Sequence, residues 1–490
     1  MKTYLAIMLG SMLIATGTTL LAIRLARHLR IMDAPGARKV HAVATPRTGG
    51  IAIIVAMLAM VVPVLTLDNT IGHSLRQNQE QVIALLAGGF LMFLVGLVDD
   101  VRGLRARTKL AAQLVLAAGV CALGVRVEEI TLPGGYEIAL GWLACPLTVL
   151  WIAGVTNAIN LIDGLDGLAA GIAAIACAVL AVLAIVTAQP VMAVLMLALL
   201  GSLCGFLLFN FNPARIFMGD CGSLFLGFML SGASVLCTMK TATAVGLALP
   251  MLVMGVPIFD MLFSMLRRLL ERRSPFAPDR GHIHHRLLDM GLSHSRTVVT
   301  LYCVTASIAA IGMVVMALRN VMTPIVFGVL TVLLISVFRV AGAVRLRESL
   351  AALRRNLAIA REASEEKRCF EESQLRLREA TSFESWWETV CSTADRLAFA
   401  LLTLTVTDKD GTQRTLIWQN NRLTTTDRLL RLSFRARQGG SAQPVLVEAH
   451  VGVNGSLEAA GRRGALFSRL FDEHPVANLH ATPVERRVGA

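Results

Sequence analysis

Residues 81–109 read QVIALLAGGFLMFLVGLVDDVRGLRARTK, in which an apolar run ends at two adjacent carboxylates and continues into a basic segment. The run 81–98 has the length and composition of a membrane-spanning helix. Asp99 and Asp100 then lie at a membrane boundary, where two carboxylates are unfavourable unless they bind cations or share a proton. Both are candidate functional residues, with a helix end that simply reaches water as the alternative. The basic residues that follow would suit pairing with these carboxylates or binding of a phosphate-bearing substrate: Arg102, Arg105, Arg107 and Lys109.

The whole chain has the composition of a polytopic membrane protein. It is 55% hydrophobic and 16% charged, with a mean hydropathy of +0.64 over 490 residues, which excludes an ordinary soluble enzyme. Eleven apolar runs have spanning or near-spanning length: 4–23, 51–67, 81–98, 110–125, 138–156, 168–187, 191–209, 222–239, 243–265, 298–318 and 322–338. We therefore predict an all-α membrane domain of about 11 transmembrane helices over residues 1–340. The first run lacks a small-residue cleavage site and is predicted to be a retained helix.

Lys and Arg are distributed unevenly among the predicted loops. Eighteen lie in the first, third, fifth, seventh and ninth connections, whereas the opposite side holds five: Lys2, Arg76, Arg126, Lys240 and Arg319. Because positively charged loops stay in the cytoplasm, the N-terminus is predicted outside and the C-terminus inside. Much of the net charge of +13 is then a topology signal, and no nucleic-acid partner is expected. Five polar stretches fall on the predicted cytoplasmic side, which indicates an active site facing that compartment.

The chain changes character after about residue 340. Residues 341–380 are charged and favour a helix, with Leu and Ala spaced 4-3-4-3 at its start; two heptads indicate an amphipathic connector, with dimerisation as the alternative. Further on, DKDG lies between apolar segments 397–407 and 412–418, and QGG between 429–437 and 445–451. These patterns predict two hairpins, followed by a helix over 459–472. Residues 381–490 are thus expected to form a small α+β cytosolic accessory domain, and they show no catalytic constellation.

The most specific polar stretch is TNAINLIDGLDG, residues 156–167. Asn157, Asn160 and Asp163 recur every three residues, which keeps them close together if the preceding helix continues to that point. Amide and carboxylate oxygens on one face suit a hard cation such as Mg²⁺. The glycines that surround Asp166 allow the chain to turn into the next span. The alternative is that these side chains merely cap a helix.

A second turn, NFNPARIFMGDCGS, occupies residues 210–223. Its proline stops a helix, and Gly219 and Gly222 let a phosphate approach the main chain near a helix N-terminus. Asp220, between these glycines, is the best candidate for a metal-binding carboxylate. Simple helix capping is the alternative.

Three histidines fall within DRGHIHHR, residues 279–286. They could suggest zinc, but no cysteine accompanies them and the flanking arginines oppose a divalent cation. Pyrophosphate binding is favoured instead, and a solvated loop is the remaining alternative. The nine cysteines of the chain show no CxxC pair and are expected to be small buried residues with free thiols.

Together these stretches resemble the polyprenyl-phosphate N-acetylhexosamine-1-phosphate transferase superfamily over roughly residues 1–340. HIHHR at 282–286 and the double glycine of PRTGG at 46–50 are similar to the branch that makes undecaprenyl-diphospho-N-acetylglucosamine. The phospho-muramoyl-pentapeptide transferase branch carries consecutive histidines there, and Ile283 departs from that pattern. The resemblance implies transfer of a sugar-1-phosphate from a UDP-N-acetylhexosamine to undecaprenyl phosphate in the bacterial inner membrane. UMP is released, and the product initiates cell-envelope polysaccharide synthesis.

The resemblance also implies roles for individual residues. Asp220 and Asn160 would hold Mg²⁺, or Mn²⁺ in its place, on the UDP diphosphate. Asp99 and Asp100 would lie by the attacking lipid phosphate, one of them removing its proton, with Lys109 near the phosphates. The substrate-binding set would be Lys39, His41, Arg47, Asn157, Asp163, Asp166, His282, His284 and Arg286. Direct attack by the lipid phosphate is favoured over a covalent route, since cationic groups can stabilise the charge without a covalent step.

The C-terminal domain lies outside the core of that superfamily. Regulation, formation of a homodimer and docking of a downstream glycosyltransferase are the alternatives for its role, and the sequence does not decide among them. Two other readings of the membrane domain fit less well. A CDP-alcohol phosphotransferase needs Arg where this chain has Ala170, and the second half of its motif is missing. A transporter would place ionisable residues near the middle of its spans, whereas here they collect at the predicted cytoplasmic ends.

Overall fold

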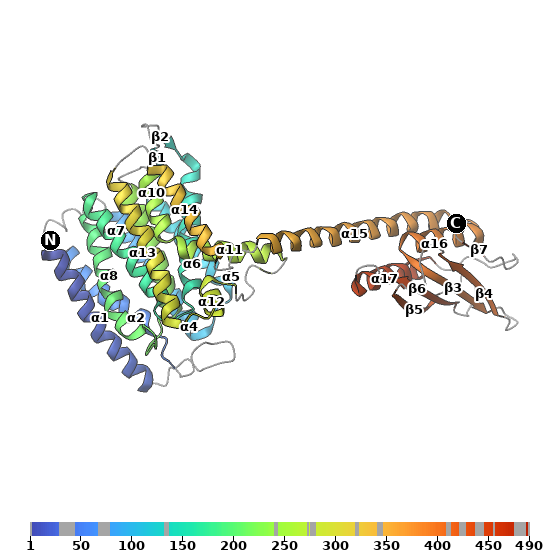
Figure 1. Cartoon of the computed structure of the whole chain (residues 1–490), viewed down its shortest axis with the longest axis horizontal. Helices are drawn as coiled ribbons and strands as arrows, with labels where there is room; N and C mark the ends of the chain where they lie inside the picture. Colours follow the sequence, from blue (N-terminus) through green and yellow to red (C-terminus); the bar gives the residue numbers. More distant parts are fainter. Residues whose placement is uncertain are drawn as a thin grey trace. The chain divides into compact units, whose positions relative to one another are not determined.

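The computed structural model shows two compact units, Met1–Ser349 and Leu350–Ala490. The first is a helical bundle, and the second contains a sheet with helices packed on it (Figure 1). The structure describes residues 2–28, 45–66, 79–131, 137–239, 244–271, 274, 281–318, 323–340, 346–407, 413–420, 428–436, 445–453, 456–474 and 487–488.

Each apolar run predicted from the sequence corresponds to helix in the bundle. The helices are α1 (Lys2–His28), α2 (Gly49–Thr66), α4 (Gln79–Arg102), α5 (Ala106–Ala122), α6 (Ala144–Ile162), α7 (Leu168–Val186), α8 (Pro190–Asn210), α9 (Gly219–Met239), α10 (Ala244–Val253), α11 (Gly255–Leu270), α12 (Ile283–Asp289), α13 (His294–Leu318) and α14 (Thr323–Val340). Among the described residues, eight helices are long and apolar enough to cross a membrane: α1, α2, α4, α6 with the turn before it, α7, α8, α9 and α13. The chain is therefore a multi-pass membrane protein.

The predicted count of 11 spans is not confirmed. The run 110–125 gives α5, which has only 17 residues, and the apolar helix at 325–340 is shorter still. The run 243–265 forms two helices, because α10 ends at Val253 and α11 begins at Gly255. Pro257 explains this break, because proline has no N–H to donate to the preceding turn and fits best in the first turn of a helix, where Pro257 lies in α11.

Helix α9 is the centre of the bundle. Every residue from Cys221 to Thr238 is buried, and α9 packs against α2, α4, α6 and α7. A helix that is largely apolar on all sides is either surrounded by protein or exposed to lipid, and here protein surrounds it. Gly96 of α4 allows one of these contacts, because a Cβ at this position would lie 2.5 Å from both the carbonyl oxygen of Asp220 and the Cα of Cys221. The end of α4 is thereby brought directly against the start of α9.

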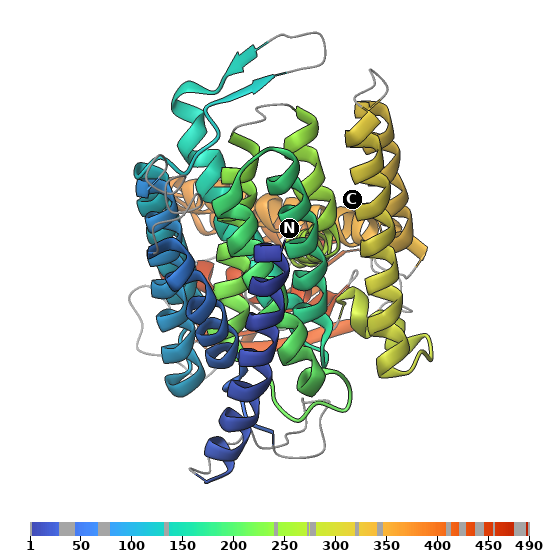
Figure 2. The same ribbon diagram turned by 90° about the vertical axis from the view of Figure 1, so that its left-hand side faces the viewer.

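A short hairpin, β1 (Glu129–Thr131) and β2 (Glu137–Ala139), connects α5 to α6. It lies at the end of the bundle opposite α12 (Figures 1 and 2). A 3₁₀ turn over Gly141–Leu143 follows it and leads into α6. The sequence patterns did not predict this hairpin.

The second unit contains most of α15 (Leu346–Glu379), with α16 (Phe383–Arg396), α17 (Leu457–Glu473) and a sheet. Its strands are β3 (Phe399–Thr407), β4 (Gln413–Gln419), β5 (Leu429–Ala436), β6 (Val445–Gly452) and β7 (Arg487–Val488), in the order β5-β6-β3-β4-β7. Both predicted hairpins are present as the antiparallel pairs β3–β4 and β5–β6, and their turns lie outside the described residues. Phe399, Phe467 and Phe471 lie in its core. The predicted α+β character of this part of the chain is confirmed.

Candidate active site

The predicted polar stretches are joined by main-chain hydrogen bonds at one end of α9. Gly49 and Gly50 donate their N–H groups to the carbonyl oxygens of Phe217 and Met218 at 3.0 and 2.8 Å, and Phe217 donates to Pro46 at 2.7 Å. The PRTGG stretch therefore lies beside the turn that leads into Asp220. Gly219 in that turn has φ +77°, a left-handed conformation that glycine adopts without strain.

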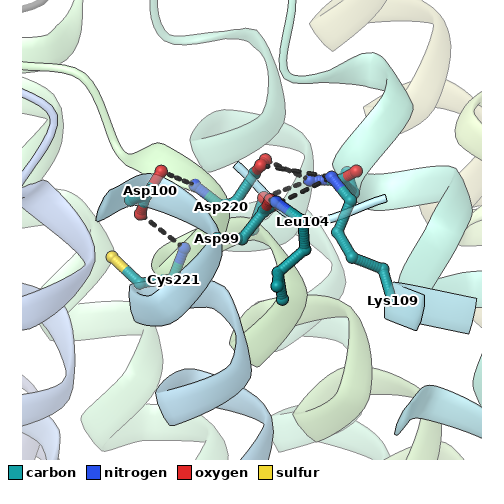
Figure 3. A network of polar contacts seen from close by, with 8 residues as sticks. Asp99, Asp100, Leu104, Lys109, Asp220 and Cys221 are labelled. Carbon is teal, nitrogen blue, oxygen red and sulfur yellow. Dashed lines mark hydrogen bonds and ion pairs between the residues drawn. The ribbon is translucent and has the colours of Figure 1, made fainter. Parts of the chain in front are cut away.

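Two carboxylates from different helices share one lysine. Asp99 Oδ2 lies 2.7 Å and Asp220 Oδ2 3.4 Å from Lys109 Nζ (Figure 3). The Asp99 side chain is only 4% exposed, whereas that of Asp220 is 34% exposed. Asp99 Oδ1 also accepts the N–H of Leu104 at 2.6 Å, which fixes the turn between α4 and α5. Asp220 is thus the carboxylate of this cluster that remains accessible to a ligand.

Asp100 points in a different direction from Asp99, although the two are neighbours in the sequence (Figure 3). Its Oδ1 accepts the N–H of Asp220 and its Oδ2 accepts that of Cys221, both at 2.9 Å. These N–H groups belong to the first turn of α9, where no carbonyl of the same helix is available to them. Asp100 therefore fixes the start of α9, and with it the position of Asp220.

The two asparagines of α6 have different surroundings. Asn160 Nδ2 donates to Asp220 Oδ1 at 2.7 Å and to Ser223 Oγ at 2.9 Å, so Asn160 orients Asp220. Asn157 Nδ2 instead contacts Gln113 of α5 and donates to the Ala153 carbonyl at 2.9 Å. The two asparagines therefore have different partners within the protein, and their predicted grouping around one ligand stays a prediction.

The turn after α6 is held by its neighbours. Asp166 Oδ2 accepts the amide of Asn212 at 2.9 Å and the main-chain N–H of Ala214 at 3.1 Å. Gly167 donates its N–H to Asn210 Oδ1 at 3.1 Å. Asp166, predicted to bind substrate, thus joins two polar loops to each other.

Asp163, in the same turn, has a strongly shifted pKa. Burial, together with the negative charge of Asp220, raises its pKa to about 8, and the positive charge of Arg47 opposes this shift. Arg47 was predicted to bind substrate, and the charge coupling places it near the same turn. A carboxyl group with so high a pKa becomes ionised readily only when a cation or a positively charged partner approaches it.

The histidine loop packs against the same turn. His284 Nε2 lies 2.9 Å from where a Cβ on Gly164 would be, and His294 Nε2 accepts the N–H of Asp166 at 3.1 Å. Burial lowers the pKa of His284 to about 3, so this residue is neutral. Within the described part of this loop, the permanently charged side chain is therefore that of Arg286, and pyrophosphate binding by the loop stays a prediction.

Asp260 of α11 contacts the same loop. It is 3% exposed. Its Oδ2 lies 2.9 Å from His282 Nδ1, and its Oδ1 accepts the N–H of Ile283 at 2.7 Å. Asp260 was not predicted from the sequence, although a lone carboxylate within the apolar run 243–265 is itself a signal of a buried partner.

The donor set near Asp220 fits Mg²⁺ bound together with a substrate. Among the residues described, no group of three or more His, Cys, Asp or Glu side chains could hold a metal by itself. Mg²⁺ needs no such cage, because one or two carboxylates plus substrate phosphates and water are sufficient. Asp220 supplies one accessible carboxylate. Asn160 makes both of its hydrogen bonds through Nδ2, so its amide oxygen remains available as a second ligand.

The remaining residues predicted to bind substrate are Arg286, Lys39 and His41. Arg286 lies in α12, close to the histidines of that helix. Lys39 and His41 lie outside the described residues, so their predicted roles stay predictions. Side chains that the sequence analysis missed, beyond Asp260, hold the polar loops together: Gln113, Asn210, Asn212, His294 and Tyr302.

Comparisons with known proteins agree on one family. Residues 82–238 match glycosyl transferase family 4. A probable undecaprenyl-phosphate N-acetylglucosaminyl 1-phosphate transferase of Bacillus subtilis is 37% identical over 57% of this chain and 76% of its own length. A decaprenyl-phosphate N-acetylglucosaminephosphotransferase of Mycobacterium leprae is 34% identical over 57% of this chain and 75% of its own. A phospho-N-acetylmuramoyl-pentapeptide-transferase of Shouchella clausii is also 34% identical, over 55% of this chain and 82% of its own.

The matched segment contains Asp99, Lys109, Asn160 and Asp220, which form the cluster described above. The relatives are transferases, which favours the enzyme over the transporter. The resemblance to the N-acetylglucosamine-1-phosphate transferase branch, drawn from the polar stretches, is confirmed by the first two relatives. This chain therefore belongs to glycosyl transferase family 4.

Proposed function

We propose that this chain transfers N-acetylglucosamine-1-phosphate from UDP-N-acetylglucosamine to undecaprenyl phosphate, with Mg²⁺ as cofactor and UMP as the second product. The observation that carries the proposal is the contact of Lys109 with Asp99 and Asp220, which come from two helices. The names of the relatives supply the polyprenyl phosphate and the transferred sugar phosphate. The site would face the cytoplasm from the bacterial inner membrane, since the basic loops lie on that side.

Asp220 would hold Mg²⁺, with the Asn160 amide oxygen as a second protein donor. When bound, the ion supplies positive charge that offsets the diphosphate and makes its phosphorus more electrophilic. Asp100 keeps Asp220 in place through the two main-chain hydrogen bonds at the start of α9. Preorganisation of this kind is effective because the group need not reorient during the reaction.

In the proposed reaction, an oxygen of the lipid phosphate attacks the phosphorus next to the sugar. A new P–O bond forms to the lipid phosphate while the P–O bond to UMP breaks, and UMP leaves with the electron pair. Lys109 stabilises the charge on the transferring phosphate. Asp99, 2.7 Å from Lys109 Nζ, orients that ammonium group and accepts the lipid phosphate proton when one is present. No covalent enzyme intermediate is needed.

The test uses the purified full chain in detergent with undecaprenyl phosphate, MgCl₂ and single UDP-sugars, and it measures UMP. We expect UMP from UDP-N-acetylglucosamine only when both the lipid and a divalent ion are present, with Mn²⁺ replacing Mg²⁺ in a parallel arm. Preferred turnover of UDP-N-acetylmuramoyl-pentapeptide would assign the chain to the alternative activity. UMP release that is independent of the lipid would contradict transfer.

A substitution of Lys109 tests the cluster itself. Lys109→Gln should lower turnover by about 10²–10³-fold, the usual effect of removing one preorganised electrostatic group. Arg126→Gln is the matched control, because Arg126 is exposed beside the β1–β2 hairpin and pairs with Glu128. Equal turnover by the two variants would show that the cluster does not take part in the reaction.

A further inference from the structure

Asp260 is a buried carboxylate to which the proposed reaction assigns no role. It lies in α11, within the apolar run 243–265, and is 3% exposed. Both of its oxygens bind the start of α12, at His282 Nδ1 and at the Ile283 N–H. A buried carboxylate is retained only with such partners, because removing it from water without them is strongly unfavourable. The pairing therefore determines how His282 is held.

The contact selects one tautomer of His282. A carboxylate offers only hydrogen-bond acceptors, so the His282 nitrogen that faces it must carry a hydrogen. In the neutral ring the opposite nitrogen, Nε2, is then an acceptor. Among the described residues, no hydrogen bond to a side chain or main chain engages His282 Nε2. This nitrogen is consequently the atom that His282 can offer to a ligand.

The surroundings connect His282 to the turn that carries two of the acids predicted to bind substrate. The rings of His282 and His284 are stacked, with centroids 5.7 Å apart and planes 9° apart. His284 in turn lies against Gly164, in the turn that carries Asp163 and Asp166. A neutral acceptor cannot bind a phosphate oxygen, which is itself only an acceptor. A sugar hydroxyl or an acetamido N–H does have the hydrogen that Nε2 requires.

We propose that Asp260 is a positioning residue that holds His282 with hydrogen on Nδ1, so that Nε2 accepts a hydrogen bond from the hexosamine of the UDP-sugar. This inference rests on the proposed function for the identity of the ligand. It assigns His282 to recognition of the sugar and leaves the diphosphate to Lys109 and Asp220. Asp260 acts through His282 and does not touch the substrate.

Binding measurements separate this role from a structural one. Asp260→Asn has the same shape, but its NH₂ group donates to Nδ1 and leaves the hydrogen on Nε2, so Nε2 can no longer accept. Calorimetry at constant Mg²⁺ should show about 10–100-fold weaker binding of UDP-N-acetylglucosamine, the usual effect of removing a partner that orients a histidine. Binding of UDP should be unchanged, and so should the thermal melt. Asp289→Asn, which changes an exposed acid at the end of α12, is the control.

A second variant tests whether Asp260 acts through His282. His282→Gln places an amide oxygen near the position of Nε2 and has no tautomer to select. On that background Asp260→Asn should add less than a twofold loss of UDP-N-acetylglucosamine affinity, because residues that act as one unit are not additive. The proposal is overturned if the double variant loses UDP-N-acetylglucosamine affinity by the product of the two single losses. It is also overturned if UDP loses as much affinity as UDP-N-acetylglucosamine does.

Two further results keep the outcomes distinct. If Asp260→Asn fails to fold, side-chain ¹⁵N spectra of the unsubstituted protein decide the point, since hydrogen on His282 Nε2 would contradict the inference. If the unsubstituted chain neither binds UDP-N-acetylglucosamine nor releases UMP from it, the proposed function fails. If it does both and Asp260→Asn binds normally, only the role of Asp260 is wrong.

Discussion

Substitution of Asp100 gives the sharpest test of how the site is built. Asp100→Asn keeps one acceptor oxygen, so one of the two N–H groups of α9 that now lie 2.9 Å from the carboxylate loses its partner. A hydrogen bond to a charged group contributes about 1.5–3 kcal/mol, and loss of negative charge at a helix N-terminus about 0.3–1 kcal/mol more. We therefore expect the free energy of unfolding to fall by about 2–4 kcal/mol.

The assay compares Asp100→Asn with Asp99→Asn in thermal melts and in UMP release per folded molecule. Asp99 contacts Lys109 directly, so Asp99→Asn should lose turnover by about 10²-fold or more while binding of the UDP-sugar persists. Asp100→Asn should instead melt earlier and retain a larger share of its turnover at low temperature. A variant of Asp100 that melts like the unsubstituted protein and is nevertheless inactive would refute the reasoning and place Asp100 in the reaction.

Four other outcomes can be measured. Asp220→Asn removes the accessible carboxylate and should reduce UMP release by at least about 10²-fold at ordinary Mg²⁺; near-normal release would exclude it as the metal ligand. Gly96→Ala puts a methyl group 2.5 Å from main-chain atoms of α9, so it should lower the free energy of unfolding by about 1–3 kcal/mol and reduce turnover. An unchanged melting temperature would show that α4 and α9 can move apart at no cost in stability. The raised pKa of Asp163, about 8, means that the folded protein keeps this proton where the unfolded chain has lost it. That contribution to stability is fully present below about pH 4 and is lost progressively as the pH rises to about 8. The melting temperature of the ligand-free protein should therefore fall between about pH 4 and pH 8 and then level off, and the fall should be smaller in Asp163→Asn. A chain ending at residue 340 should keep its specific activity, because every residue assigned to the site precedes residue 290; a folded but inactive shortened chain would show that the second unit is needed.

The apolar runs located the helices well, because a helix that crosses a bilayer requires a long uninterrupted apolar segment. They could not show that one run is broken, although Pro257 carries that information. From the sequence, Asp99 and Asp100 were also expected to lie together by the lipid phosphate. Successive residues on a helix point about 100° apart, so one carboxylate faces Lys109 and the other faces the start of α9. Which of them faces the lysine depends on how α4 packs, and no local pattern contains that information.

Asp260 shows a second limit to what can be predicted from the sequence. Its position inside an apolar run was visible, and an ionisable residue there is expected to have a function. Its partner lies 22 residues away in the chain, and only the packing of α11 against the histidine loop brings the two together. The polar residues that chemistry requires could thus be listed from the sequence, whereas the residues that orient them could not.

The placement of Asp220 explains why orienting residues matter so much in this protein. Asp220 lies in the first turn of α9, a helix that is buried along almost its whole length and packs against several neighbouring helices. Asp100 fixes that turn from α4, Asn160 orients the carboxylate from α6, and the PRTGG stretch holds the preceding residues. A shift of any of these elements moves the Asp220 carboxylate, the proposed metal ligand, relative to Lys109, and even a displacement of about 1 Å can lower a rate 10²-fold. Substitutions at the helix contacts should therefore reduce turnover without touching a substrate, and their effect should appear in the rate constant before it appears in nucleotide affinity.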